Sequence, residues 1–135
     1  MKLLILLSLF LVTVGMANQS QAEEHSENVC TSADQTICAH LGYHWGVPTS
    51  STEAKFMFHV MTDLGDISDL KIKLWMDMGN GHGHGSSPVE IKDLGQNKFL
   101  ISKAYFVMAG PWLVRAQFTL NGHSYNLDIP VNIEN

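Results

Sequence analysis

The sequence predicts an all-β protein made of two antiparallel sheets packed face to face. From Lys55 onward, apolar and polar residues alternate in short runs, as they do in half-buried strands. Turn-forming residues separate these runs at spacings of roughly 8–15 residues, as in β-sandwiches. No stretch of useful length has the 3.6-residue apolar period of an amphipathic helix. The length of 135 residues allows one such domain, with about seven strands.

The N-terminal segment predicts export. Lys2 precedes an apolar run over 3–14, after which the chain turns polar. Ser20 and Ala22 supply small residues at the positions that signal peptidase reads, so we expect a signal peptide over 1–22, with an uncleaved anchor as the alternative. The run is shorter than the roughly 20 residues of a membrane span. We therefore expect a periplasmic or secreted protein with no transmembrane segment in the mature chain.

The next segment, 23–48, is expected to precede the sandwich domain, which would occupy 49–135. Residues 23–36 are polar without periodicity and predict an exposed leader, and the rest of the segment is irregular and rich in aromatic residues and histidine. It contains both cysteines, Cys30 and Cys38. An even pair in an oxidising compartment predicts a disulfide. Metal ligation by thiolates and unpaired thiols are the alternatives.

Within the domain, six runs predict strands and the segments between them predict turns. Asn121-Gly122 is a strong signal for a tight hairpin, and Pro130 ends the last strand or puts it at an edge. A glycine-rich loop is expected from 78 to 88. The expected strands are 55–62, 70–76, 89–92, 98–107, 112–120 and 123–129, with 131–133 as an extension.

Composition argues against two classes of function. The net charge is −5 and basic residues do not cluster, whereas binding to nucleic acid needs a basic face. The chain has no Gly-x-Ser-x-Gly elbow and no phosphate loop, and no carboxylate lies in an apolar run, so we expect no enzyme. The unusual feature is seven histidines together with seven methionines.

Two methionines and two histidines form the main candidate metal site. Met76, Met78, His82 and His84 lie within nine residues, where a strand meets the glycine-rich loop. Thioether sulfur is a soft ligand that suits Cu(I), and imidazole binds either oxidation state of copper. Glycines let such a loop fold back so that ligands from its two ends converge. Copper is thus the expected metal, and the alternative is a core methionine beside a polar loop.

Four further residues are weaker candidates for metal binding. Cys38, His40 and His44 have the spacing Cys-x-His-x3-His, which suits a soft metal if Cys38 is a thiolate. Met108 lies at the end of an expected strand and could reach the same end of the sandwich as Met76. A separate row on one strand face, Met57-His59-Met61, is expected to be a semi-exposed surface, with a metal role as the alternative.

Two motifs resemble the YtkA-like/FixH-like family. Trp75-Met76-Asp77-Met78 with the following Gly-His-Gly is similar to the family's Met-Pro-x-Met-x-His-Gly, although Asp77 stands where proline is usual and the His-Gly repeat is longer. The segment from Phe106 to Trp112 matches its Phe-x-Met-x-Gly-x-Trp. The resemblance covers about residues 53–120. It implies an exported or membrane-tethered immunoglobulin-like β-sandwich, linked to copper handling or to assembly of copper-containing oxidases.

These observations lead to two expectations for function. The first is a periplasmic copper-binding protein, either a chaperone or a resistance buffer for Cu(I) and Cu(II). The second is a module without enzymatic activity that binds another envelope protein, for example during assembly of a copper oxidase. In that case the contacts would be made by sheet edges or by Tyr43 and Trp45.

Overall fold

A computed structural model describes residues 26–31 and 36–135. All the named secondary-structure elements in these residues are β-strands. The expected signal peptide over 1–22 lies outside the described residues. None of the described residues forms a helix long and apolar enough to cross a membrane. The all-β prediction is confirmed. The nine strands are β1 (Ser26–Cys30), β2 (Cys38–Gly42), β3 (Glu53–Met61), β4 (Ser68–Gly79), β5 (His82–Gly85), β6 (Glu90–Gly95), β7 (Lys98–Tyr105), β8 (Gly110–Leu120) and β9 (His123–Ile133).

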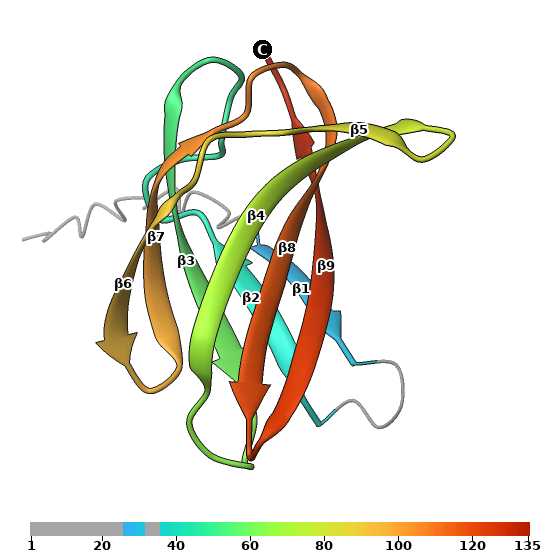
Figure 1. The fold of residues 1–135 in the computed structure, drawn as a ribbon. Coiled ribbons are helices and arrows are strands. Elements are labelled where there is room, and N and C mark those ends of the chain that lie inside the picture. The colour runs from blue at the N-terminus through green and yellow to red at the C-terminus, as the bar shows by residue number, and fades with distance from the viewer. Residues whose placement is uncertain (1–25, 32–35) are drawn as a thin grey trace, which may run out of the picture.

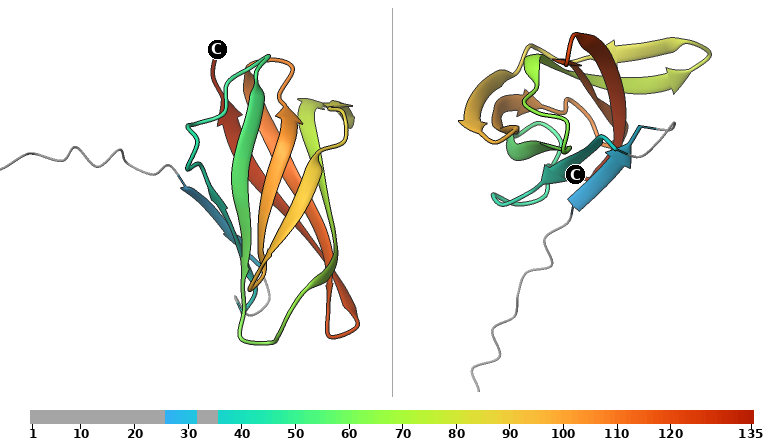
Figure 2. Two further views of the ribbon diagram at one scale, coloured as in Figure 1. Left: turned by 90° about the vertical axis from the view of Figure 1, so that its left-hand side faces the viewer. Right: turned by 90° about the horizontal axis from the view of Figure 1, so that it is seen from below.

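The strands form two sheets. One has the order β1-β2-β3-β7-β6 and the other β5-β4-β8-β9, and all neighbouring strands in both are antiparallel (Figure 1). The sheets lie face to face as two layers (Figure 2). The predicted antiparallel sandwich is therefore confirmed, with nine strands rather than about seven.

Alternating residues of both sheets fill the space between the layers. Phe56, Phe58 and Val60 of β3 face the core, as does Trp112 at the start of β8. No polar or charged side chain is buried within the described ranges. The core is therefore apolar, and the polar residues of each strand lie on its outer face, as the alternation predicts.

Glu27, Asn28 and Cys30 are exposed, as expected for the leader, but they belong to the strand β1. The prediction of an irregular segment is wrong where β2 forms, and both strands belong to the five-stranded sheet. Ala39 and Leu41 are fully buried, so β2 has the usual alternation. Its outward positions hold Cys38 and His40, which obscured the pattern in the sequence. The predicted disulfide is confirmed, because Cys30 and Cys38 face each other in the register and their sulfurs are bonded at 2.04 Å.

The prediction of a glycine-rich loop over 78–88 is also wrong in part. β4 continues to Gly79, and β5 returns beside it as a hairpin that extends sideways at the upper end of Figure 1. Asn80 and Gly81 form the turn with φ of 52° and 76°, the left-handed conformation that two-residue hairpin turns require. The signal for this turn, an Asn-Gly pair, is present in the sequence. The same pair, Asn121-Gly122, closes the β8–β9 hairpin.

Candidate metal centre

One end of the sandwich gathers the residues of the main candidate site. The β4–β5 hairpin, the β7–β8 connection and the C-terminus all lie at the upper end in Figure 1. Met76 on β4 stands opposite His84 on β5 in the strand register. Residues paired in this way share a face, with Cβ atoms about 4.5–5.5 Å apart. Met76 is buried and His84 is exposed, so this pair of neighbouring positions spans the boundary of the core.

The side chain of Met76 reaches the first residue of β8. A Cβ atom added to Gly110 would lie 2.7 Å from the terminal methyl carbon of Met76, so this methyl group rests directly against the glycine. Gly110 also has φ of 128°, which residues with a side chain rarely adopt. The backbone conformation at position 110 therefore favours glycine, and a side chain there would push the end of Met76 aside.

The surrounding segment, Phe106 to Trp112, fixes the backbone of Met108. Phe106 and Trp112 are both buried and pack edge to face, with ring centroids 5.4 Å apart. The indole Nε1–H of Trp112 donates a hydrogen bond to the carbonyl oxygen of Met108 over 2.9 Å. This bond closes the turn, while the side chain of Met108 stays 39% exposed. Met108 is thus held two residues from the glycine that contacts Met76.

Met78 and His82 lie farther along the hairpin, beyond the Met76–His84 pair. The register shifts between Asp77 and Gly79, and Asp77 accepts a hydrogen bond from the backbone N–H of Gly79 over 2.9 Å. This irregularity leaves Met78 56% exposed and pairs His82 with Gly79. Regular geometry would hold successive same-face residues about 7 Å apart, so bending here is needed before Met76 and Met78 can share one ion.

The kinds of donor present restrict which metal this end could hold. In the part of the chain that the structure describes, no group of three or more His, Cys, Asp or Glu side chains is placed to hold a metal ion. The candidate ligands at this end are the imidazoles of His82 and His84 and the thioethers of Met76, Met78 and Met108. Neutral thioether and imidazole donors fit copper, and Cu(I) best. They do not fit the hard cations Mg²⁺ and Ca²⁺, which need oxygen ligands.

The second candidate set, Cys38, His40 and His44, has no thiolate donor. The sulfur of Cys38 is in the disulfide, so the alternative of a thiolate ligand there is wrong. His40 lies on the outer face of β2, whereas His44 lies in the turn after β2 beside Trp45, with ring centroids 5.9 Å apart. The structure thus places the two histidines on different elements.

Sequence reasoning missed the contact between Gly110 and Met76 and the role of Trp112 in holding Met108. The motif Phe-x-Met-x-Gly-x-Trp was visible, but the spacing alone does not tell which strand it faces. Comparisons of this chain with protein-family models, with curated proteins and with solved structures give no match.

Proposed function

We propose that this protein binds copper at the hairpin end of the sandwich and acts as a carrier or buffer for it. Met76 and His84 would be the central ligands, and Met78, His82 and Met108 would supply further donors. The observation that carries the proposal is the contact of the Met76 methyl group with Gly110, which joins the two methionine-containing segments. The same two segments carry the resemblance to the YtkA-like/FixH-like family.

The different exposure of the three methionines supports transfer of the metal by ligand exchange. Met76 is 8% exposed and holds a fixed position, whereas Met78 and Met108 are exposed and can reach a partner or the solvent. The thioether of methionine has no titratable proton, so it can bind and release Cu(I) without proton transfer. Copper would pass to a partner through the exposed sulfurs, with no change in its oxidation state.

The proposed compartment is the periplasm. The disulfide fits an oxidising environment, and the N-terminal apolar run predicts export. A methionine-based site suits that environment, because free thiols there are lost to oxidation whereas this site needs none.

The test is a Cu(I) titration against a competing chromophoric chelator. The double variant Met76→Leu with Met78→Leu removes both sulfurs and conserves volume, so the apo protein should lose less than about 1.5 kcal/mol of stability. We expect its Cu(I) affinity to fall. The matched control is Met57→Leu with Met61→Leu on β3 of the other sheet, which should bind as the native protein does. Native-like affinity in the first variant would contradict the proposal.

The alternative is an interaction or assembly module for another envelope protein. Trp45 and Val47 are 54% and 48% exposed in the connection from β2 to β3, beside a hollow of about 370 Å³. Tyr43 is less available, because it packs edge to face on Phe56 and burial raises its pKa. A pull-down from membrane extract with native protein and Trp45→Ser, with and without a copper chelator, separates the functions. A partner protein captured by the native protein but not by Trp45→Ser, to the same extent with and without the chelator, would favour the interaction module.

A further inference from the structure

Two histidines that are distant in sequence lie side by side on the outer face of the five-stranded sheet. His40 of β2 and His59 of β3 are partners in the antiparallel register. Their neighbours Ala39 and Phe58 are fully buried, so both imidazoles point away from the core, and both are half-buried. Partners of this kind have Cβ atoms about 4.5–5.5 Å apart, which lets two imidazoles reach one ion between them.

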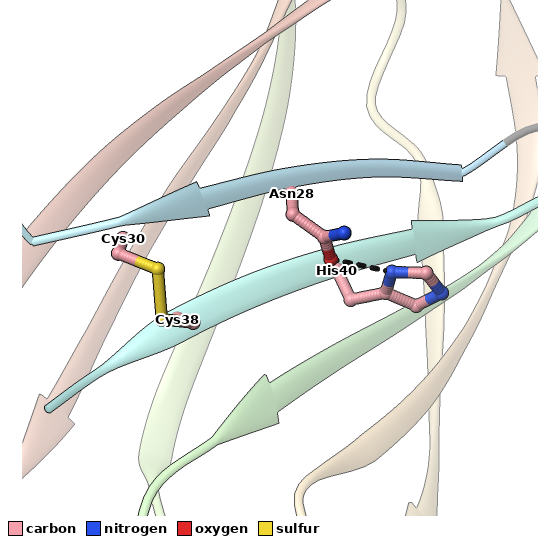
Figure 3. Close-up of a disulfide and its surroundings, with 4 residues drawn as sticks. All are labelled: Asn28, Cys30, Cys38 and His40. Atoms are coloured by element: carbon pink, nitrogen blue, oxygen red, sulfur yellow. Dashed lines mark hydrogen bonds between the residues drawn. A yellow bond between two sulfur atoms is a disulfide. The ribbon is translucent and has the colours of Figure 1, made fainter. Parts of the chain in front are cut away.

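The ring of His40 is already oriented. The side-chain oxygen of Asn28 on β1 lies 2.7 Å from Nδ1 of His40 (Figure 3). An amide oxygen only accepts, so Nδ1–H donates and the lone pair of the neutral ring is on Nε2. Nε2 lies on the side of the ring away from Asn28 in Figure 3. Metal-binding histidines usually have this arrangement, in which one nitrogen donates to an oxygen and the other binds the ion.

The partner, His59, is half-buried on the same face, between His40 of β2 and Lys98 of β7 in the register. Its pKa is lowered by burial first, then by the positive charge of Lys98, and then by His40. All these causes favour the neutral imidazole over the charged one.

We propose that His40 and His59 form a two-nitrogen site for a divalent transition metal, with Cu²⁺ bound most tightly. Copper stands first because divalent first-row metals bind nitrogen ligands in an order that peaks at Cu²⁺. Two imidazoles leave the other coordination positions to water. The site shares no residue with the proposed copper site at the hairpin end, which uses the other sheet.

Two neighbours act on this site in opposite directions. The Cys30–Cys38 disulfide joins β1 to β2 one same-face step from the Asn28–His40 pair, so it holds the edge strand in register and keeps Asn28 on His40 (Figure 3). Lys98 of β7 stands opposite His59 and brings a positive charge that repels a cation. The disulfide therefore supports binding, and Lys98 weakens it.

The test uses the full-length protein and Cu²⁺ alone, read by electron paramagnetic resonance and by competition titration. The native protein should give a signal with splitting from two nitrogens at this site. His40→Gln and His59→Gln should each abolish that two-nitrogen signal. His123→Gln, an exposed histidine at the start of β9, is the matched control and should keep it. An unchanged signal and affinity in both test variants would overturn the proposal.

A second measurement on the native chain avoids dependence on the folding of the variants. Titration with diamagnetic Zn²⁺, followed by imidazole resonances, should shift His40 and His59 together at one stoichiometry. If neither moves, the proposal is wrong. The double variant His82→Gln with His84→Gln should keep the two-nitrogen Cu²⁺ signal, so failure of the hairpin site and failure of this one can be told apart.

Two further variants test how Asn28 and Lys98 act on the two-histidine site. The readout is Cu²⁺ affinity, which a purely structural role of these residues would not change in the directions given. Asn28→Ala should weaken Cu²⁺ binding about 10–100-fold, the usual effect of removing such an orienting partner. Lys98→Gln should tighten Cu²⁺ binding about threefold to tenfold at low salt, because it removes a repelling charge. Unchanged affinity in Asn28→Ala, or weaker binding in Lys98→Gln, would count against the two-histidine site.

Discussion

Replacement of Gly110 by alanine should destabilise the protein and weaken copper binding at the proposed site. The new Cβ atom would lie 2.7 Å from the terminal methyl carbon of Met76, closer than real Cβ atoms come to other atoms. The backbone at this position has φ of 128°, so alanine is strained there even without the contact. The substitution therefore acts on the backbone of β8 and on the side chain of Met76 together.

The two effects can be given magnitudes. Backbone strain at a position that favours glycine costs about 1–3 kcal/mol. Forcing the end of Met76 aside in a packed region costs about 1–3 kcal/mol, nearer the lower figure because its end is flexible. We expect a loss of about 2–4 kcal/mol in the free energy of unfolding. For a domain of this size about 4 °C corresponds to 1 kcal/mol, so the melting temperature should fall by about 8–16 °C.

Urea unfolding of the apo protein and the Cu(I) titration provide the assay. Gly85→Ala is the matched control, since its Cβ atom would have ordinary contacts from 3.7 Å outward and its φ is not positive. In a double-mutant cycle, Met76→Ala should cost at least about 1 kcal/mol less in the Gly110→Ala background than in the native protein, because there it also relieves the collision. A Gly110→Ala variant as stable as the control, or full additivity in the cycle, would refute the contact.

Three more predictions follow from individual interactions. Trp112→Phe removes the hydrogen bond to the carbonyl of Met108 and should cost about 2–3 kcal/mol in urea unfolding and lower the Cu(I) affinity. The pKa of His59 lies below its ordinary value of 6.5, so protonating this residue costs more in the folded state, and stability is lost as the pH falls below 6.5. His59→Gln, which still faces Lys98, should therefore lose less stability than the native protein between about pH 7.5 and about pH 5.5, as measured by melting temperature. Reduction of the Cys30–Cys38 disulfide, which closes a loop with a separation of 8, should cost about 2.5 kcal/mol in thermal unfolding, and equal stability of the reduced form would contradict this.

Strand alternation predicted most of the sandwich, and the strands it missed have a physical explanation. β3 and β8 were found because buried apolar residues recur at every second position along them. The outward positions of β2 hold Cys38 and His40, so its alternation between large apolar and polar residues is weak. β5 is the tetrapeptide His-Gly-His-Gly and has no intrinsic preference for a strand. It forms a strand because the Asn80-Gly81 turn returns the chain alongside β4.

The candidate sites were only partly predictable, because each depends on a register between distant segments. The sequence identified Met76 and His84 as candidate ligands, but their pairing depends on the Asn80-Gly81 turn. The contact of Met76 with Gly110 joins residues on different strands. The pairing of His40 with His59 arises from the register of β2 on β3, and no spacing in the sequence indicates it.

The position of Met76 would let the proposed copper carrier stay folded without its metal. A buried imidazole or carboxylate needs a hydrogen-bonding or charged partner, and without the metal it would destabilise the core. A thioether has no such requirement, because methionine packs in an apolar core as an ordinary hydrophobic residue. Met76 can therefore contribute to the core in the apo protein and still present sulfur at the boundary where His84 is exposed. On this reasoning the polar ligands stay near the surface and the soft ligand alone enters the core, so loading and release of copper need no refolding of the sandwich.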